Sequence, residues 1–326
     1  MSMKINALPP VVCIVGPTAS GKTSASIAVA KRFDCEIVSA DSMQLYRGMD
    51  VGTAKPTEAE REGIPHWMFD VADPEESMSV VKYAGMARAC CDGILSRGRL
   101  PLIVGGTGQY VNAVIRDENF APEPASEDIR REFEAFAAEF GNEALHGLLR
   151  EKDPESADRI HANNVKRVVR ALEIITLTGK TLGQVYAEQE PPRDVYDALM
   201  FCLCPEPREL LYSRIDRRVE IMLENGLMDE VRALSSRQLS PTSLQAIGYK
   251  ELFPVLSGEC GLEAAAEDIC RRTRNYAKRQ LTWFRADKRI EFLTYRTGEE
   301  YCLAIERICQ KIKEKTGEVF EKCKSR

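Results

Sequence analysis

The sequence predicts an α/β protein with a P-loop fold, in which a doubly wound, mainly parallel sheet carries a helical insertion domain. Three observations predict this fold. A glycine-rich stretch, GPTASGKT at 16–23, stands between a β-branched run and a helix-like segment. Short apolar runs then alternate with helix-like segments along the chain. After Pro122 and Pro124 the pattern becomes wholly helical and stays so until Pro191-Pro192.

The expected strands are short apolar runs, as in a parallel sheet that is covered on both faces. In chain order they are Val11–Val15, Glu36–Ser39, an extended segment at Pro65–Val71, Leu100–Val104, Leu199–Cys204 and Ile290–Leu293. Helices are expected from Gly21 to about Phe33, over Val80–Ser96, throughout 126–190, before Asp287 and at the C-terminal end. We therefore predict a catalytic core at 1–125 and 191–326 and a helical insertion domain at 126–190.

Composition restricts the function classes. A net charge of −5 argues against a protein that coats nucleic acid with its whole surface, although residues 271–289 hold eight Lys/Arg and one acid. Three histidines and no C-x-x-C motif among eleven cysteines disfavour a zinc site. The apolar runs are too short to span a bilayer, and Val11–Val15 is too short for the core of a signal peptide. We expect a cytoplasmic protein without a membrane partner.

The glycine-rich stretch matches the phosphate-binding motif G-x-x-x-x-G-K-[ST]. Its glycines let backbone N–H groups converge on phosphate oxygens, and the helix that follows directs its positive end at the anion. Lys22 adds a positive charge, and Thr23 offers a hydroxyl to Mg²⁺. The expected diphosphate-binding residues are Gly16, Pro17, Thr18, Ala19, Ser20, Gly21, Lys22 and Thr23, with Thr23 also the expected metal contact and Mg²⁺ the expected cofactor.

The companions of this motif in nucleoside triphosphatases are missing. The strand Leu100–Val104 runs into Gly105-Gly106-Thr107-Gly108 without the acid that usually helps to hold the metal. Asp41 instead follows the second predicted strand, whose carboxyl end faces the ligand crevice of such a fold. Two reaction classes fit: a kinase that uses ATP to phosphorylate a small molecule, and a transferase whose leaving group is a diphosphate. An RNA-binding module with a degenerate cradle is a third alternative.

Six stretches, in the same order, resemble the tRNA dimethylallyltransferase family, also called tRNA isopentenyltransferase. They are GPTASGKT (16–23), DSMQLYRGMDVGTAKP (41–56), GGTGQY (105–110), IHANNVKRVVRALEI (160–174), AIGYKE (246–251) and TRNYAKRQLTWFR (273–285). One departure is Gln109, where the family usually has Leu. The resemblance covers nearly the whole chain and favours the transferase.

The resemblance implies transfer of a dimethylallyl group from dimethylallyl diphosphate to the exocyclic N6 of adenosine 37, just 3′ of the tRNA anticodon, with release of pyrophosphate. Prenylation of free AMP is a nearby alternative, but it would leave the helical insertion and the basic 271–289 segment without a role. Because a stacked adenine cannot reach a buried cradle, it must be extruded from the anticodon loop. We expect a monomer that clasps the anticodon stem-loop with its insertion.

The resemblance also assigns roles to residues. Asp41 would accept the proton from N6, Thr107 would orient the reacting centre, and Arg218, next to the less favoured Arg217, would contact the diphosphate. The residues implied to approach the tRNA are Asp41, Ser42, Met43, Gln44, Thr107, Arg130, Val165, Lys166, Arg167, Val168, Val169, Gln245, Ala246, Ile247, Gly248, Tyr249 and Lys250.

The basic segment is the expected site of phosphate contacts, which would offset the cost of extruding the base. The residues concerned are Arg271, Arg272, Arg274, Lys278 and Arg279. Three aromatic residues, Tyr276, Trp283 and Phe284, alternate with these charges. We expect at least two of the three to lie on the apolar side of an amphipathic helix.

Overall fold

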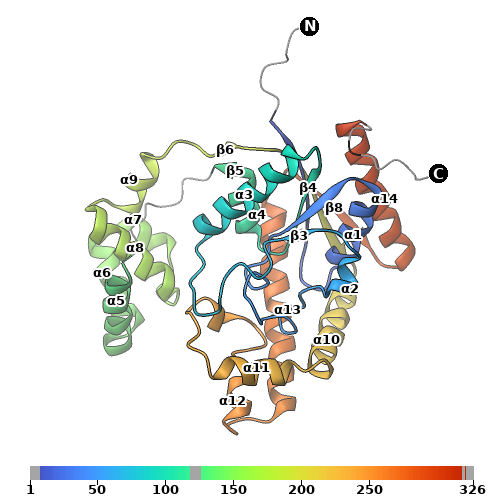
Figure 1. Ribbon diagram of the computed structural model, residues 1–326. Helices are drawn as coiled ribbons and strands as arrows, with labels where there is room; N and C mark the ends of the chain where they lie inside the picture. The colour runs from blue at the N-terminus through green and yellow to red at the C-terminus, as the bar shows by residue number, and fades with distance from the viewer. Residues whose placement is uncertain (1–7, 118–125, 318–319, 321–326) are drawn as a thin grey trace, which may run out of the picture. The chain divides into compact units, whose positions relative to one another are not determined.

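The computed structural model describes residues 8–117, 126–317 and 320 (Figure 1). The chain divides into two compact units. The first comprises Met1–Arg116 and Asp194–Arg326, and the second comprises Asp117–Arg193. The boundary predicted at residue 125 lies outside the described residues. A short ribbon, in which β5 (Arg116–Asp117) pairs with β6 (Arg193–Asp194), marks where the chain leaves the first unit and returns to it.

A six-stranded sheet forms the centre of the first unit, in the order β3-β2-β4-β1-β7-β8. Every described pairing in it is parallel, which confirms the predicted α/β fold class. The strands are β1 (Pro10–Val15), β2 (Cys35–Ser39), β3 (His66–Trp67), β4 (Leu100–Gly105), β7 (Asp197–Pro205) and β8 (Ile290–Tyr295). The central strand β1 is flanked by β4 and β7, so the loop that follows it lies between the carboxyl ends of its neighbours.

Side chains of β1 alternate between the two faces of the sheet, as the period of a strand requires. Val11, Cys13 and Val15 join a hydrophobic cluster with α3 (Val80–Ser96) and α4 (Gly108–Ile115). Val12 and Ile14 join the opposite cluster, with α1 (Lys22–Arg32) and α14 (Gly298–Thr316). Further helices of this unit are α2 (Glu58–Arg61), α10 (Arg208–Glu224), α11 (Leu227–Ser235), α12 (Phe253–Leu256) and α13 (Leu262–Ala286), with a short 3₁₀ helix at Ser243–Gln245.

The extended segment predicted at 65–71 is mostly wrong, since β3 contains only two residues. Directly after it, Met68 and Asp70 adopt positive φ angles of 69° and 54°, which ends the strand. The buried ammonium of Lys55 binds Asp70 at 2.7 Å and thereby holds this bend.

The second unit is helical. It contains α5 (Glu127–Phe140), α6 (Asn142–Lys152), α7 (Pro154–Arg159), α8 (Val165–Thr178) and α9 (Leu182–Ala187). Its core is built from apolar side chains of α5 to α8. The fully buried carboxylate of Glu173 is compensated by Arg130 at 2.9 Å, by Arg170 at 2.6 Å and by the N–H of Ser126.

Across the described ranges, none of the helices is at once long and apolar enough to cross a membrane.

Candidate active site

The phosphate cradle follows β1 and ends at the first residues of α1. Gly16 has a φ of 147°, and a Cβ there would lie 2.5 Å from the carbonyl oxygen of Leu203. Gly21, at the start of α1, has a φ of 74°. Ala19 is also in the left-handed region, at 61°. The two glycines are therefore required by backbone conformation and by close approach of the neighbouring strand.

Lys22 is positioned by the cradle itself, because its ammonium donates a hydrogen bond to the carbonyl of Pro17 at 2.7 Å. Burial, reinforced by the charge of Arg218, lowers the pKa of Lys22 to about 8, although Asp41 acts in the opposite direction. A cation that is destabilised in this way gains from an anionic ligand, so the site is suited to a diphosphate.

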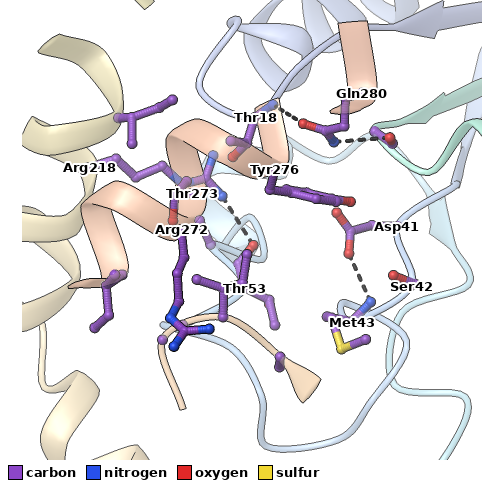
Figure 2. Close-up of a pocket in the computed structure, with 18 of the residues that line it drawn as sticks. Thr18, Asp41, Ser42, Met43, Thr53, Arg218, Arg272, Thr273, Tyr276 and Gln280 are labelled. Carbon is purple, nitrogen blue, oxygen red and sulfur yellow. Dashed lines mark hydrogen bonds between the residues drawn. The ribbon is translucent and has the colours of Figure 1, made fainter. Parts of the chain in front are cut away.

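Asp41 lies two residues beyond β2. One carboxylate oxygen, Oδ1, accepts the N–H groups of Met43 at 2.9 Å and Gln44 at 3.3 Å, which fixes the side chain in a turn. Figure 2 shows the other oxygen on the side of the Tyr276 ring. The carboxylate thus combines a fixed orientation with an oxygen directed towards the cavity, as a proton acceptor requires.

Thr107 lies near Asp41, in the loop after β4. Its hydroxyl oxygen accepts the N–H of Ser42 at 3.3 Å, and the hydroxyl lies near that of Tyr276, whose pKa it lowers slightly against the effect of burial. Burial, with a smaller contribution from Asp41, raises the pKa of Tyr276 to about 12, so this tyrosine is a neutral donor at neutral pH. Thr107, Ser42 and Tyr276 therefore form one polar group beside the carboxylate of Asp41.

Gln280 joins this group to the phosphate cradle; it lies within the motif stretch 273–285, but its role is not predicted from the sequence. Its side chain is buried, accepts the N–H of Thr18 at 2.9 Å and donates to the carbonyl of Gly106 at 3.0 Å (Figure 2). A Cβ on Gly106 would lie 2.1 Å from its amide nitrogen, which explains the glycine at that position. Through Gln280, α13 holds the cradle and the loop after β4 together.

The structure distinguishes Arg218 from Arg217. Arg218 lines the cavity and donates a hydrogen bond to the carbonyl of Thr53 at 3.2 Å. Burial lowers the pKa of its guanidinium, and Asp41 partly opposes this effect. Arg217 has a side chain that is 60% exposed and pairs with Glu220 at 2.9 Å. Of these two arginines, Arg218 is the one placed to contact a ligand in the cavity.

Many of the residues above line one cavity of about 580 Å³, large enough for a small organic diphosphate, but Gly16, Gly21 and Thr107 are not among its lining residues. Among the predicted residues, those lining it are Thr18, Lys22, Thr23, Asp41, Ser42, Met43, Gln44, Arg218, Gln245, Ala246, Ile247, Gly248 and Lys250, together with Arg271, Arg272 and Arg279 of the basic segment. The loop after Asp50 also lines it, through Gly52, Thr53 and Ala54. Cations, a carboxylate and the segments implied to bind tRNA therefore share one space.

That loop is held by Glu230 of α11, a second residue that the sequence does not reveal. The carboxylate of Glu230 accepts three successive N–H groups, from Asp50 at 2.9 Å, Val51 at 2.8 Å and Gly52 at 3.0 Å. The backbone of the loop in turn binds Arg218 and the side-chain amide of Gln44, both through Thr53. Glu230 therefore fixes a cavity wall without lining the cavity.

Part of the basic helix α13 is already neutralised by acids. Arg271 and Arg272 pair with Asp268, Arg272 also pairs with Glu251, and Arg274 pairs with Asp216. Lys278 and Arg279 are exposed. Among the expected phosphate contacts, these two require the least rearrangement.

The expectation for the three aromatic residues of α13 is wrong. Phe284 is buried in the core, but Trp283 is 46% exposed and Tyr276 lines the cavity. Trp283 lies against the backbone at Gly108, where a Cβ would come within 2.0 Å of the indole. The apolar side of the helix is provided instead by small and aliphatic residues such as Ala265, Ile269 and Ala277.

The predicted tRNA residues differ in exposure. In the segment 245–250, Gln245 is exposed, Ile247 and Lys250 are half-buried, and Tyr249 is fully buried. In the helical unit, Lys166 and Arg167 are exposed at the start of α8, whereas the side chains of Val168 and Val169 belong to the unit's core. Arg130 is bound to Glu173.

The fold and this site define a P-loop protein whose cavity holds cationic side chains beside a carboxylate. Comparison with known proteins then identifies the family. A family model described as IPP transferase matches residues 44–287, and one described as isopentenyl transferase matches residues 9–71. The chain belongs to the IPP transferase family, which confirms the resemblance carried by its six motifs.

Curated relatives and solved structures agree with this assignment. A tRNA dimethylallyltransferase of Halalkalibacterium halodurans is 50% identical over 275 residues, which cover 84% of this chain and 87% of the relative. One from Geobacillus thermodenitrificans is 46% identical over 299 residues, or 91% of this chain and 94% of the relative.

Among solved structures, the tRNA isopentenylpyrophosphate transferase of Bacillus halodurans matches with a TM-score of 0.70 at 45% identity, over 96% of this chain and 98% of that one. A eukaryotic dimethylallyltransferase described as acting on tRNA matches with a TM-score of 0.78 at 28% identity, over 95% of this chain and 79% of that one.

Proposed function

We propose that this protein transfers a dimethylallyl group from dimethylallyl diphosphate to the exocyclic N6 of adenosine 37 in tRNA and releases pyrophosphate. The observation that carries the proposal is the shared cavity, in which Asp41 lies in the same space as Lys22 and Arg218. The family membership and the relatives named tRNA dimethylallyltransferase support the same reaction.

The electrostatics of the cavity suit this chemistry. As the allylic C–O bond breaks, negative charge accumulates on the departing diphosphate, where Lys22, Arg218 and the N–H groups at the start of α1 would stabilise it. Adenine N6 is a weak nucleophile because its lone pair is delocalised into the ring. Asp41 would take its proton as the C–N bond forms.

Magnesium fits this site as a partner of the diphosphate. Thr23 lines the cavity and would offer its hydroxyl, while phosphate oxygens and water would supply the remaining ligands. Within the described part of the chain, no group of three or more His, Cys, Asp or Glu side chains could hold a metal ion alone. When bound, Mg²⁺ would add positive charge to the leaving group.

Several features make the kinase alternative less favourable. The strand β4 ends in glycine, without an acid to hold the metal of a bound nucleoside triphosphate. The comparisons match transferases over most of the chain.

We also propose that the enzyme acts as a monomer, because one chain supplies the cradle cations and the carboxylate.

The decisive experiment incubates the purified protein with dimethylallyl diphosphate and a tRNA that has adenosine 3′ of its anticodon. Mass spectrometry of the digested tRNA should show dimethylallyladenosine, and this nucleoside should map to position 37 of the tRNA. A parallel incubation with ATP should yield no ADP. ADP formation without prenyl transfer would support the kinase, and modification of free AMP in preference to tRNA would contradict the proposed acceptor.

A further inference from the structure

The outer side of the phosphate cradle is held by three side chains from distant parts of the chain. Three successive carbonyl oxygens accept hydrogen bonds: Ala19 from Nε of Arg214 at 2.8 Å, Ser20 from the hydroxyl of Tyr295 at 3.0 Å, and Gly21 from the hydroxyl of Tyr301 at 2.6 Å. These donors lie on α10, on β8 and on α14, respectively. None of the three belongs to the motif itself.

Because the peptide bond is planar, these contacts also set the direction of the N–H groups in the cradle. In a trans peptide, the C=O of one residue and the N–H of the next point in opposite directions. A donor that holds the Ser20 carbonyl outward therefore directs the N–H of Gly21 the other way, and a donor on the Gly21 carbonyl does the same for the N–H of Lys22. Backbone N–H groups of this loop are what a phosphate cradle uses to bind its anion.

We propose that Tyr295 and Tyr301 are positioning residues of the diphosphate cradle, whose hydroxyls aim the N–H groups of Gly21 and Lys22 at the ligand. This inference rests on the proposed function, in which the ligand is a diphosphate. Both tyrosines lie beyond residue 287, where the match to the IPP transferase model ends.

The two hydroxyls are not equivalent. The Gly21 carbonyl also accepts the N–H of Ala25, in the first turn of α1, so its direction is fixed in part by the helix. Tyr295 is the donor that the described residues provide to the Ser20 carbonyl. Loss of the Tyr295 hydroxyl should therefore affect the cradle more than loss of the Tyr301 hydroxyl.

The surroundings of these tyrosines suit a fixed support. Tyr295 is 3% exposed, and its ring packs against that of Tyr301 with the centroids 5.0 Å apart. Burial raises the pKa of Tyr295 to about 12, so its hydroxyl keeps its proton at neutral pH. Residue 21 suits glycine because its φ is 74°, and a Cβ there would also press on the Tyr301 ring, 3.0 Å away.

The test compares Tyr295→Phe and Tyr301→Phe with a matched control, Tyr196→Phe. Each change removes one hydroxyl and keeps the ring. Tyr196 is buried like Tyr295, and its hydroxyl donates to Asp92 at 2.6 Å. It precedes Asp197, which pairs with Pro10 at the end of β1 remote from the cradle. Tyr196→Phe therefore reports the general cost of losing a buried hydroxyl.

The readout is the affinity for inorganic pyrophosphate, measured by calorimetry in magnesium-containing buffer, together with the melting temperature and the KM values of both substrates. Tyr295→Phe should weaken pyrophosphate binding about fivefold to tenfold, the scale of one misdirected hydrogen bond, and raise the KM of the prenyl donor without changing that of tRNA. Tyr301→Phe should have a smaller effect in the same direction. Tyr196→Phe should lower the melting temperature and leave pyrophosphate affinity unchanged.

Suppose that both tyrosine variants bind pyrophosphate as tightly as the wild type, while their melting temperatures fall as in the control. This result would overturn the positioning role and leave the proposed prenyl donor unaffected. If the wild-type protein binds no pyrophosphate, this result contradicts both the proposed prenyl donor and the inference about the tyrosines. Equal losses of pyrophosphate affinity in all three variants would reduce the effect to general destabilisation and would also overturn the inference.

Discussion

The hydroxyl of Tyr249 donates a hydrogen bond to Oε1 of Glu230 at 2.5 Å. Tyr249 belongs to the segment 245–250 that is expected to meet the tRNA, and Glu230 holds the loop at 50–52. The ring also packs on this loop, since a Cβ on Gly52 would lie 2.6 Å from it. This pair therefore connects the segment 245–250 with the cavity wall that binds Arg218.

We predict that Glu230→Gln raises the KM of the prenyl donor more than it lowers kcat. An amide can accept fewer N–H groups than a carboxylate, so the loop and Arg218 lose their fixed positions. Tyr249→Phe removes only one of the four donors to Glu230 and should give a smaller change in the same direction. Steady-state kinetics with both substrates would test this, and an unchanged donor KM in Glu230→Gln would contradict it.

Replacing Asp41 with Asn should slow the chemical step about 10²- to 10⁴-fold, the usual value of a general base. Asn keeps an oxygen for the Met43 N–H but cannot accept the proton from N6. Single-turnover rates with saturating substrates measure the step directly. Binding of pyrophosphate and tRNA should stay close to wild type, and a variant with undiminished turnover would remove Asp41 from this role.

Arg218 and Arg217 offer a neighbouring pair for testing the leaving-group cation. Arg218→Gln should lower kcat/KM for the donor about 10²-fold, the scale of one lost donor to developing charge. Arg217→Gln should remain within about twofold, because exposed ion pairs contribute little. Comparable losses in both variants would show that the nearby charge matters more than the contact made in the cavity.

The affinity for the diphosphate should fall as the pH rises through 8. Because burial lowers the pKa of Lys22 to about 8, its charge is present below that pH and is lost above it. The dissociation constant of pyrophosphate should rise towards tenfold per pH unit above pH 8, as linkage to one proton requires, with about one proton taken up per site there. Calorimetry in buffers of different ionisation enthalpy measures that proton.

Lys22→Arg is the control for this pH dependence, since a guanidinium stays charged over the whole range. Its pyrophosphate affinity should lack the step near pH 8. The effect of Lys22 on the free energy of unfolding has the opposite sign to that of a lysine in a stabilising ion pair. The lowered pKa makes the charged lysine unfavourable in the native state, so Lys22 reduces stability below pH 8, and this penalty disappears as the pH rises towards 10.5.

Gln280→Met should lower kcat/KM for the donor about tenfold, because the N–H of Thr18 and the buried carbonyl of Gly106 both lose their partner. Gln280→Glu keeps an acceptor for Thr18 but presents a carboxylate to the Gly106 carbonyl, so it should be no better. Thr282→Ala, on the same helix, is the control, since its exposed hydroxyl donates to the carbonyl of Lys278 in its own helix. Identical kinetics with the prenyl donor for Gln280→Met and Thr282→Ala would exclude a role for the two hydrogen bonds of Gln280.

The sequence could predict those parts of the site that are local in the chain. The cradle is eight consecutive residues between a strand and a helix, and Asp41 follows a strand directly, so pattern and spacing are sufficient. Gln280 lies 262 residues from Thr18, and Tyr295 lies 275 residues from Ser20. Such contacts arise only when the sheet and its helices pack, so the motif stretch 273–285 includes Gln280 without indicating its partner.

The same reasoning explains the errors. The apolar character of 65–71 predicted a strand, but the ion pair of the buried Lys55 ammonium with Asp70 favours a bend. On α13, the aromatic residues suggested a packed face, yet Tyr276 lines the cavity and Trp283 lies against the backbone at Gly108, in the loop after β4. Tertiary contacts of this kind override local propensity.

The ion pair between Arg116 and Asp194, at 3.1 Å, brings together the points where the chain leaves the catalytic unit and rejoins it. A segment attached through adjacent ends can grow, shrink or be exchanged with little penalty to the fold that carries it, since closing a longer loop costs only about 0.6 kcal/mol per doubling of its length. The helical unit is thus modular: it can diverge through one pair of junctions, while the fold at the sheet stays as it is.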